Sequence, residues 1–568
     1  MALGYLNRPE LTRTKFIQSP FPEKAAGTMY KTGDLVRWFD DGTIAFLGRT
    51  DNQVKVRGFR IEPEEIEYCL AGHPFVKQAV VAVKKDSTGQ NQLVGYIVPD
   101  LEAATDRNEK KDCETSLLDW HRAIHNHYTD MDVAELTFNI SGWNSSYTGQ
   151  PIPSSDMRQW AERTAEQIIA LKPVHVLEIG CGTGLILSRV APVCKSYVGI
   201  DFSTAALDFT RQMINKTKNL SHVRVQEQEA RDFRGFEKET VDTIIINSVI
   251  QYFPDAAYIL EVIKNALIVL KPGGKIFIGD VRNLKLQKEF YVSVERFKRG
   301  PSADVKDIIA GVNHAKANEE ELFVDPDFFY DLRAKFPETG HIAVRPKPGQ
   351  YRNEMSLYRY DVVIYKQAVL PGVTVNKGPV ETIHELVRMI REHPGIPIKI
   401  ESIANARNQK DQWMMQQLEN HMAGDKAESF LNDPDIFIPA GIEPEDIIKV
   451  CRSLSVTPEF FISGKYHFDL IVQPENAPLV LTEKRSDDSI DRPDKKASPF
   501  TNQPALGIFM KKLVPGVRAY LRNHLPGHMV PSFLLVLESL PLLPGGKIDR
   551  KALPDPLSMN MRIQGGNM

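Results

Sequence analysis

A glycine-rich string in the middle of the chain has the residue types of a nucleoside-binding turn. It follows an apolar run at residues 174–179, and a second apolar run at 196–200 ends at an acidic residue. Glycines let a backbone approach a ligand closely, and a carboxylate can accept hydrogen bonds from two ribose hydroxyls. We therefore expect a nucleoside at the carboxyl end of the first strand. The candidate residues are Glu178, Gly180, Gly182, Gly184 and Asp201.

The spacing of the glycines distinguishes two classes of nucleotide site. Residues 180–184 have the pattern Gly-x-Gly-x-Gly with Glu178 before it. A dinucleotide site has Gly-x-Gly-x-x-Gly and places a pyrophosphate on a helix N-terminus. The string resembles that of S-adenosylmethionine-dependent methyltransferases, and the resemblance implies that cofactor. A glycine turn without a ligand is the alternative interpretation.

The segments around the string alternate between strand and helix patterns. An apolar run at 242–246 leads into a polar and aromatic loop at 247–254, and a turn at 270–275 leads into another apolar run at 276–278. Such alternation predicts a mostly parallel sheet that is covered by helices on both faces and binds ligands at its carboxyl edge. The predicted fold class is α/β, and the resemblance implies a class I, Rossmann-like methyltransferase with seven strands.

Motifs near both ends of the chain point to a second domain. Residues 30–35 read Tyr-Lys-Thr-Gly-Asp-Leu, and the chain later reads Leu-Pro-Gly-His-Met-Val-Pro and Gly-Gly-Lys-Ile-Asp-Arg. In this order the motifs resemble the late motifs of adenylation domains in nonribosomal peptide synthetases. The resemblance implies that Asp34 and Arg49 contact the ribose of an adenylate, that Asp51 is a hinge, and that Lys547 reaches the acyl-phosphate.

The local patterns of this second domain predict a small α+β fold. Asp41 and Gly42 predict a hairpin turn, and Gly58 interrupts an alternating strand pattern in the way that a bulge does. We do not expect adenylation from this chain alone, because the phosphate-cradling loop and amino-acid pocket of an adenylation domain lie upstream of the motif at 30–35.

The middle of the chain resembles the N-methyltransferase domains that are inserted into adenylation domains. The strings that carry this resemblance are residues 143–153, 247–254, 279–282, 353–354 and 359–361. The resemblance implies that the substrate is the α-amine of an aminoacyl thioester on a carrier protein's phosphopantetheine. It also implies that other synthetase modules are partners.

The reaction implied by this resemblance does not require a strong base. An α-amine has an unperturbed pKa of about 7.7 to 8.0, so a neutral fraction exists near pH 7. The site must chiefly hold the amine in line with the methyl group. Asn247 could accept a hydrogen bond from the amine and also contact the cofactor, while Tyr147 and Tyr252 could line the site or simply pack. Asp232 would meet the adenine amine, in a segment that departs from the family pattern because Arg231 directly follows the alanine.

Weaker candidates have structural alternatives. Glu354 and Arg282 could orient the substrate, but a helix cap or an ion pair explains each equally well. Histidines at 121, 125 and 127 with Asp130 and Asp132 lack a supporting metal-ligand motif, so we expect no metal site. Methylation of a free small molecule at oxygen or carbon, or a docking role without catalysis, are the alternative functions.

Composition narrows the possible partners and the compartment. The chain has 568 residues, a net charge of −3 and no large basic block, which argues against nucleic acid as a partner. We expect no membrane partner, because no apolar run is long enough to span a bilayer. Its five cysteines form no Cys-x-x-Cys pair, which favours reduced thiols and a cytoplasmic location.

Polar stretches and the two sets of motifs predict the order of parts along the chain. The predicted parts are the end of an adenylation core (1–50), the first part of its C-terminal subdomain (51–100), a linker (101–116), the methyltransferase (117–367), the C-terminal part of the insertion (368–482), a second linker (483–504), the second part of the subdomain (505–556) and a tail (557–568).

Overall fold

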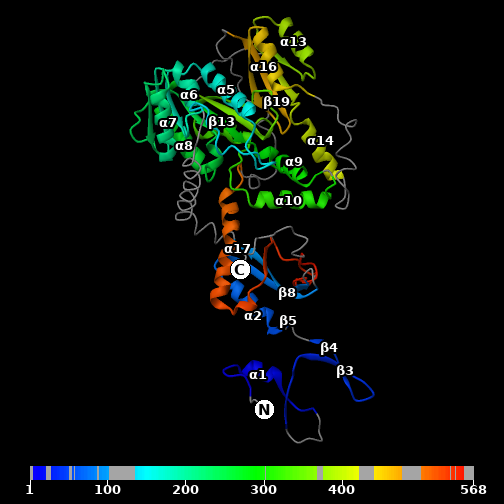
Figure 1. The fold of residues 1–568 in the computed structure, drawn as a ribbon. Coiled ribbons are helices and arrows are strands. Elements are labelled where there is room, and N and C mark those ends of the chain that lie inside the picture. The colour runs from blue at the N-terminus through cyan, green and yellow to red at the C-terminus, as the bar shows by residue number, and fades with distance from the viewer. Residues whose placement is uncertain are drawn as a thin grey trace. The chain divides into compact units, whose positions relative to one another are not determined.

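The chain is divided into two units in the computed structural model (Figure 1). One unit combines residues 1–109 with 511–568, and the other comprises residues 110–510, which lie between these two pieces in the sequence. The structure describes residues 4–20, 27–49, 54–56, 58–85, 89–100, 135–300, 302–367, 375–420, 441–475, 500–537, 539–543 and 545–554. The predicted linker 101–116 and most of the linker 483–504 fall outside these ranges, and the predicted domain boundaries stay predictions.

The first unit has a three-stranded sheet built from both ends of the chain. Its strands are β7 (Val76–Lys85), β8 (Asn91–Pro99) and β20 (Phe533–Val536), and its helices include α2 (Pro63–Ala71) and, from residue 511 onward, α17 (Pro504–His524). The central strand β8 is antiparallel to β7 and parallel to β20. Val94 and Tyr96 share one hydrophobic core with Leu535. The two pieces therefore form a single folded body.

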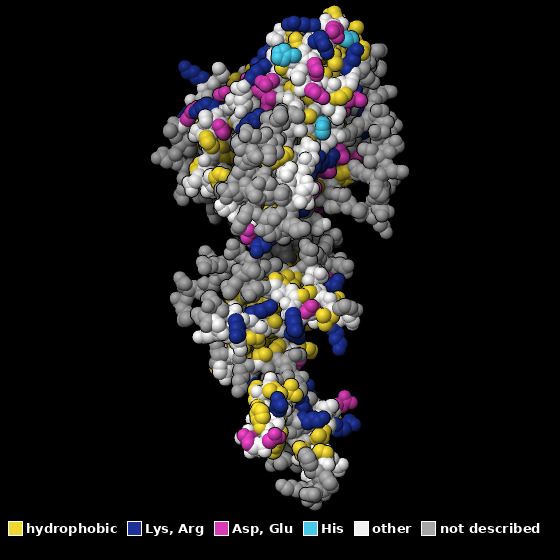
Figure 2. Space-filling view, turned by 90° about the vertical axis from the view of Figure 1, so that its right-hand side faces the viewer, with side chains coloured by type: hydrophobic (Ala, Val, Ile, Leu, Met, Phe, Trp, Pro, Cys, Tyr) yellow, Lys and Arg dark blue, Asp and Glu magenta, His cyan; other side chains and the backbone are white. Residues whose placement is uncertain are grey.

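The N-terminal residues form short elements with many exposed apolar side chains. The elements are α1 (Pro9–Lys15), β1 (Phe16–Gln18), β2 (Thr28–Tyr30), β3 (Asp34–Trp38), β4 (Ile44–Arg49), β5 (Val54–Val56) and β6 (Phe59–Ile61). Figure 2 shows apolar side chains exposed in this region, and Trp38 and Phe46 of the β3–β4 hairpin are 70% and 64% exposed. The turn predicted at Asp41 and Gly42 is confirmed. The predicted bulge at Gly58 is wrong, because β5 and β6 pair as a hairpin and Gly58, at φ +83°, lies in its turn.

The second unit is built on a seven-stranded sheet in the order β11-β10-β9-β12-β13-β15-β14. Strand β15 runs antiparallel to the other six strands, which are parallel to one another, so the predicted mostly parallel sheet is confirmed. The strands are β9 (His175–Ile179), β10 (Ser196–Asp201), β11 (Val223–Glu227), β12 (Val241–Asn247), β13 (Leu270–Arg282), β14 (Thr339–Pro346) and β15 (Arg359–Lys366). The turn predicted at 270–275 is instead the beginning of the long strand β13.

Helices cover both faces of this sheet (Figure 1). The helices of this part of the chain are α5 (Ser154–Ala170), α6 (Leu187–Val190), α7 (Thr204–Lys216), α8 (Ala256–Val269), α9 (Gln287–Arg299), α10 (Val305–Ala317), α11 (Pro326–Lys335) and α12 (Glu354–Leu357), of which α9 and α10 pack together in a separate hydrophobic cluster. Leu177 of β9 packs into the core on one face, whereas its neighbour Val176 packs into the core on the other. Strands buried on both faces are nearly continuous apolar runs, which is the pattern found in the sequence.

A second, four-stranded sheet follows in the order β16-β17-β19-β18. Its strands are β16 (Val375–Lys377), β17 (Ile398–Ala404), β18 (Val456–Ile462) and β19 (His467–Pro474), and the helices of this region are α13 (Ile383–Glu392), α14 (Gln409–Asn420) and α16 (Pro444–Ser453). The apolar periodicity of the sequence predicts a helix at 383–390 and strands at 397–403 and 468–472, and α13, β17 and β19 confirm all three. Among the described residues, no helix is long and apolar enough to cross a membrane.

The end of α8 depends on a buried lysine, and this generates a stability prediction. Lys366 Nζ donates to the carbonyl oxygens of Leu267 and Leu270 at 2.8 and 2.6 Å, groups that have no partner within the helix. Replacing Lys366 with Met leaves these buried acceptors unpaired. We expect Lys366→Met to lower the free energy of unfolding by about 1 to 3 kcal/mol in denaturant titration followed by circular dichroism. Lys264→Met, at an exposed position of α8, serves as the control and should change it by less than about 0.5 kcal/mol.

Candidate active site

The glycine string forms a tight turn between β9 and the short helix α6. Gly180, Gly182 and Gly184 have φ values of +73°, +50° and +80°, which side-chain-bearing residues rarely adopt. At Gly180 a Cβ atom would lie 2.4 Å from Cγ2 of Val249, and at Gly184 it would lie 2.6 Å from Cε of Met213. The turn therefore requires glycine both for backbone conformation and for close packing.

Two buried carboxylates lie beside this turn. Asp201 ends β10 and accepts hydrogen bonds from the Gly182 and Ser203 backbone N–H groups at 2.8 and 2.9 Å. Glu178 accepts a hydrogen bond of 2.9 Å from the Tyr197 hydroxyl. Burial raises the pKa of Glu178 to about 8, and burial also raises the pKa of Asp201. A positively charged ligand in this place would stabilise both carboxylates in their ionised form.

A cavity of about 280 Å³ opens at the carboxyl edge of the sheet next to the turn. It is lined by Asn139, Ser141, Gly142, Trp143, Trp160, Glu178, Gly180, Cys181, Gly182, Thr183, Leu185, Ile186, Asn247, Ser248 and Tyr252. The two tryptophan rings are 5.0 Å apart and form an aromatic wall. The cavity thus combines the glycine turn of β9 with the polar residues that follow β12.

Asn247 lines this cavity and carries an unpaired acceptor. Its Oδ1 atom is buried and has no hydrogen-bond partner among the described residues, while its Nδ2 atom donates to Ser248 Oγ at 3.2 Å. Ser248 in turn donates to the carboxylate of Asp280 at 3.1 Å. A carboxylate only accepts hydrogen bonds, so Ser248 must donate to it and accept from the amide. This order leaves the amide oxygen of Asn247 for a ligand that donates a hydrogen bond.

The two tyrosines predicted from the sequence lie in different places. Tyr252 lines the cavity from the 3₁₀ turn Ile250–Tyr252, and burial raises its pKa to about 12, so its hydroxyl stays protonated. Tyr147 donates to Ser293 at 3.1 Å and packs its ring edge-on against Phe297, both on α9. Tyr147 is not one of the described residues that line the cavity. The structure therefore brings together Asn247 and Tyr252 but not Tyr147.

The remaining candidates are held by other contacts. Asp232 makes a bidentate pair with Arg234, at 2.6 Å for the shorter contact, which lowers the pKa of Asp232, and its carboxylate is outside the cavity lining of the described residues. Glu354 accepts from Ser146 Oγ at 2.8 Å and so anchors the loop before α5. Arg282 pairs with Glu321 at 2.6 Å. Glu354 and Arg282 thus make structural contacts, which was the alternative to a role in orienting the substrate.

The adenylation-like residues lie in the first unit. Asp34 and Arg49 are register partners at the open end of the β3–β4 hairpin. Lys547 is exposed in the turn near the C-terminus. Asp51 lies outside the described residues, as does the histidine cluster at 121–127. Of the four adenylation-like residues, Asp34 and Arg49 thus lie opposite each other at one end of a hairpin.

Sequence reasoning gave no role to a buried charge cluster behind the cavity. Asp280 accepts from Trp160 Nε1 at 3.2 Å and from Arg359 at 2.6 Å, and Asp361 accepts from Lys347 at 2.8 Å. Burial alone would raise the pKa of Asp280, but the neighbouring cations Arg359 and Lys347 outweigh it and hold the pKa below its usual value. The signal for this cluster in the sequence was the pair of strings 279–282 and 359–361, because both contribute residues to it.

The residues present fit S-adenosylmethionine. The turn at 180–184 provides the cradle that a side chain would fill, Asp201 offers a carboxylate at the end of the neighbouring strand, and Asn247 offers an unpaired oxygen. Buried carboxylates at Glu178 and Asp201 also suit the positive charge of a sulfonium. These residues would hold the cofactor, and the contact of Asp232 with adenine stays a prediction.

Comparison with protein families supports this site. Residues 177–276 match the family described as a methyltransferase domain, and this range contains the glycine turn, both buried carboxylates and Asn247. The sheet order and the site define a class I S-adenosylmethionine-dependent methyltransferase.

Relatives in sequence extend beyond this domain. The chain is 36% identical to chondramide synthase cmdD of Chondromyces crocatus, over 98% of this chain and 14% of that protein. It is 33% identical to CymA of Salinispora arenicola, a probable nonribosomal peptide synthetase, over 98% of this chain and 6% of that protein. It is 27% identical to cyclosporin synthetase simA of Tolypocladium inflatum, over 97% of this chain and 4% of that protein. The chain is thus homologous along nearly its whole length to a segment of nonribosomal peptide synthetases, and it spans only a small part of their length.

The close contact at Gly180 predicts a loss of cofactor binding on substitution. A methyl group there meets Val249, whereas Gly273 has nearly the same φ, +74°, and nothing within 4 Å of an added Cβ. We expect Gly180→Ala to weaken S-adenosylmethionine binding at least about tenfold in calorimetry, which corresponds to about 1.4 kcal/mol. Gly273→Ala should leave the affinity within about twofold, since it shares the backbone strain of about 1 to 2 kcal/mol but not the contact. Equal losses in both variants would contradict this explanation.

The raised pKa of Glu178 predicts that cofactor binding releases a proton. With a pKa of about 8 in the free protein, Glu178 is mostly protonated at pH 7, and a bound sulfonium favours its ionised form and lowers the pKa. We expect the affinity for S-adenosylmethionine to increase as the pH rises and to level off above a pH of about 8. Calorimetry at pH 7 in two buffers of different ionisation enthalpy should show release of most of one proton. Glu178→Gln should abolish most of that release, and proton uptake by the unaltered protein would contradict the assignment.

Proposed function

We propose that this chain transfers a methyl group from S-adenosylmethionine to the α-amine of an aminoacyl group. In this proposal the aminoacyl group is held as a thioester on a carrier protein's phosphopantetheine, and the chain works with other synthetase modules in the cytoplasm. The observation that carries the proposal is the buried, unpaired Oδ1 atom of Asn247 at the cavity beside the glycine turn. This atom accepts a hydrogen bond, which the N–H of an amine can donate and a carbon acceptor cannot.

The residues of the cavity orient the amine rather than deprotonate it. When bound, S-adenosylmethionine supplies a sulfonium methyl group that a neutral amine attacks, leaving a thioether and a proton for the amine to release. Asn247 accepts one N–H of the amine and so fixes the direction of its lone pair. Trp143 and Trp160 exclude water from one side, and Tyr252, whose hydroxyl stays protonated, lines the same space. Orientation of this kind can contribute about 7 to 11 kcal/mol to lowering a barrier.

The similarity to synthetases supports the carrier-bound form of the substrate. CymA is a probable nonribosomal peptide synthetase, and this chain aligns with one segment of it at 33% identity. Within the described residues the cysteines Cys69, Cys181, Cys194 and Cys451 are free, which supports a reducing compartment. In the second unit, acidic and basic side chains are interspersed on the face shown in Figure 2, which is consistent with a protein partner rather than nucleic acid.

A methyl-transfer assay tests the proposed substrate. We expect labelled methyl transfer from S-adenosylmethionine to the nitrogen of an aminoacyl-pantetheine thioester, with kcat/KM at least about tenfold higher than for the free amino acid. The rate should rise with pH through the pKa of the α-amine, about 7.7 to 8.0, because only the neutral amine attacks. Transfer to oxygen or carbon of a free molecule, with the thioester ignored, would favour the second function named above.

An Asn247 variant provides the control for this assay. Asn247→Ala removes the acceptor and should lower kcat about 10-fold to 100-fold, with binding of a methyl acceptor analogue also weakened. Asn265→Ala, whose amide donates to the Arg231 carbonyl oxygen on the surface, is the matched control and should leave kcat unchanged. If S-adenosylmethionine does not bind and Asp201→Ala changes nothing, a docking role without catalysis is the better explanation.

A further inference from the structure

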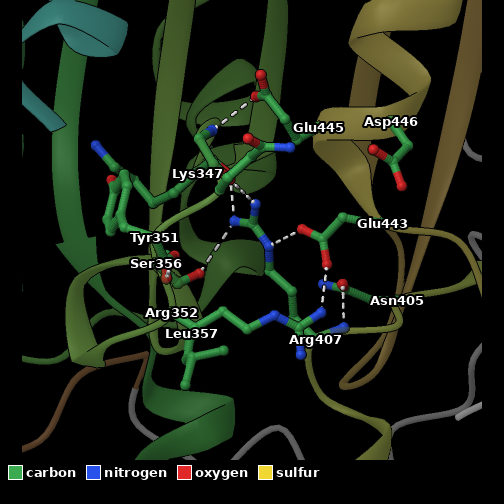
Figure 3. Close-up of polar contacts among 12 residues, drawn as sticks. Lys347, Tyr351, Arg352, Ser356, Leu357, Asn405, Arg407, Glu443, Glu445 and Asp446 are labelled. Atoms are coloured by element: carbon green, nitrogen blue, oxygen red, sulfur yellow. Dashed lines mark hydrogen bonds and ion pairs between the residues drawn. The ribbon is translucent and has the colours of Figure 1, made fainter. Parts of the chain in front are cut away.

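One buried arginine of the second sheet reaches the edge of the methyltransferase sheet. Arg407 follows β17 and is 4% exposed. Its guanidinium donates to the carbonyl oxygens of Lys347, Gly349 and Ser356, at 2.5, 2.6 and 3.4 Å, and it pairs with Glu443 (Figure 3). A planar guanidinium with five N–H donors can hold several acceptors at once, which a lysine cannot. Arg407 therefore gathers three carbonyl groups from one segment.

The segment that Arg407 holds connects β14 to α12. Gly349 has a φ of +108°, and its N–H donates to Glu445 at 2.7 Å. The other oxygen of Glu445 pairs with Arg163 of α5 at 2.6 Å. The second sheet and α16 thus fix both the N–H and the C=O of Gly349. The conformation of this segment depends on polar groups that come from outside the seven-stranded sheet.

Lys347 extends from this segment to the charge cluster behind the cavity. Its side chain is fully buried, and its ammonium donates to Asp361 at 2.8 Å and lies 3.6 Å from Asp280. Asp361 also accepts from the backbone N–H of Asp280 at 2.8 Å. Lys347 is therefore a cation on a backbone that Arg407 holds. It acts on Asp280 mainly through Asp361, while Arg359 pairs directly with the Asp280 carboxylate at 2.6 Å.

We propose that Arg407 is a positioning residue for methyl transfer. By fixing the backbone at Lys347, it places the ammonium group that binds Asp361 beside Asp280. Through Ser248, Asp280 then keeps the amide oxygen of Asn247 directed at the acceptor. The identity of that acceptor as an amine rests on the proposed function, whereas the positioning role applies to any hydrogen-bond donor in the cavity.

A role limited to joining the two sheets does not account for these contacts. Arg345 of β14 and Glu459 of β18 form a buried bidentate pair at 2.7 Å, and Arg163 pairs with Glu445. These ion pairs join the same two bodies and remain when Arg407 is changed. The three carbonyl contacts of Arg407 are concentrated on the segment that carries Lys347, where they determine backbone position.

A double-mutant cycle with Ser248 tests the proposal. We expect Arg407→Ala to lower kcat about tenfold or more, with the S-adenosylmethionine dissociation constant changed by less than about twofold. In a Ser248→Ala background, where the hydrogen-bond path is already broken, Arg407→Ala should lower kcat by less than about twofold. The same fold-loss in both backgrounds would overturn the proposal, because it would show that Arg407 acts without Ser248.

Two further variants separate positioning from loss of folding. Arg407→Lys keeps a charge for Glu443 but cannot hold three carbonyls, so it should behave like Arg407→Ala in the cycle. Arg352→Ala is the matched control, since Arg352 pairs with the same Glu443 through a side chain that is 64% exposed. It should leave kcat unchanged, and a loss equal to that of Arg407→Ala would assign the effect to Glu443 instead and overturn the proposal.

Trp160 provides a measurement that needs no methyl acceptor. Its indole N–H donates to Asp280, so displacement of Asp280 should shift its fluorescence emission. We expect Arg407→Ala to shift the emission, Arg352→Ala not to shift it, and Trp160→Phe to abolish the difference. Identical emission in Arg407→Ala and the unaltered protein would overturn the proposal. Absence of thioester methylation would instead contradict the proposed function and leave this measurement valid.

Discussion

A carboxylate has no proton to donate, so a buried carboxylate determines the direction of every hydrogen bond made to it. Asp280, which is fully buried at φ +67°, imposes this constraint behind the cavity. Its neighbour Ser248 also has a positive φ, +57°, and no room exists for a Cβ at Gly279, where it would lie 2.1 Å from Oδ1 of Asn247. Backbone strain and close packing at the ends of β12 and β13 are therefore concentrated around the amide of Asn247. The hydrogen-bonding role of the neutral Asn247 amide therefore depends on the charge of Asp280, which the ligand does not contact.

The burial of that charge requires compensation, and the structure provides it within one cluster. Asp280 and Asp361 are matched by Lys347 and Arg359, so two negative and two positive groups share one buried region. Such clusters are weak contributors to net stability, because desolvation costs about as much as pairing gains. Their effect is to make one arrangement of the surrounding groups much more favourable than others. In this chain the favoured arrangement extends from the second sheet to the end of β12.

Local signals in the sequence predicted much of the fold, and contacts between distant segments were not predictable. The apolar runs and the glycine spacing identified β9, β10 and β12 because strand and turn preferences depend on neighbouring residues. Asn247 and Tyr252 reach the cavity because Asn247 ends β12 and Tyr252 lies in the 3₁₀ turn that comes after it. Tyr147 lies against α9 instead, and Trp160 and Asp280, 120 residues apart, meet only through tertiary packing. At Gly58 the sequence pattern was ambiguous, because a bulge and a hairpin turn interrupt strand alternation in the same way.

The pairing of Phe533 with Val94 has a consequence for biosynthesis. Strand β8 leaves the ribosome long before its parallel neighbour β20, since residues 110–510 are translated between them. Until then one edge of β8 presents unpaired backbone groups, which is the feature of an unfinished sheet that most promotes aggregation. The nested enzyme can complete its own core during this interval. Slow folding of the unit at residues 110–510 would not shorten this exposure of the β8 edge. The solubility of the first unit during synthesis therefore depends on how fast the second unit is made and folds.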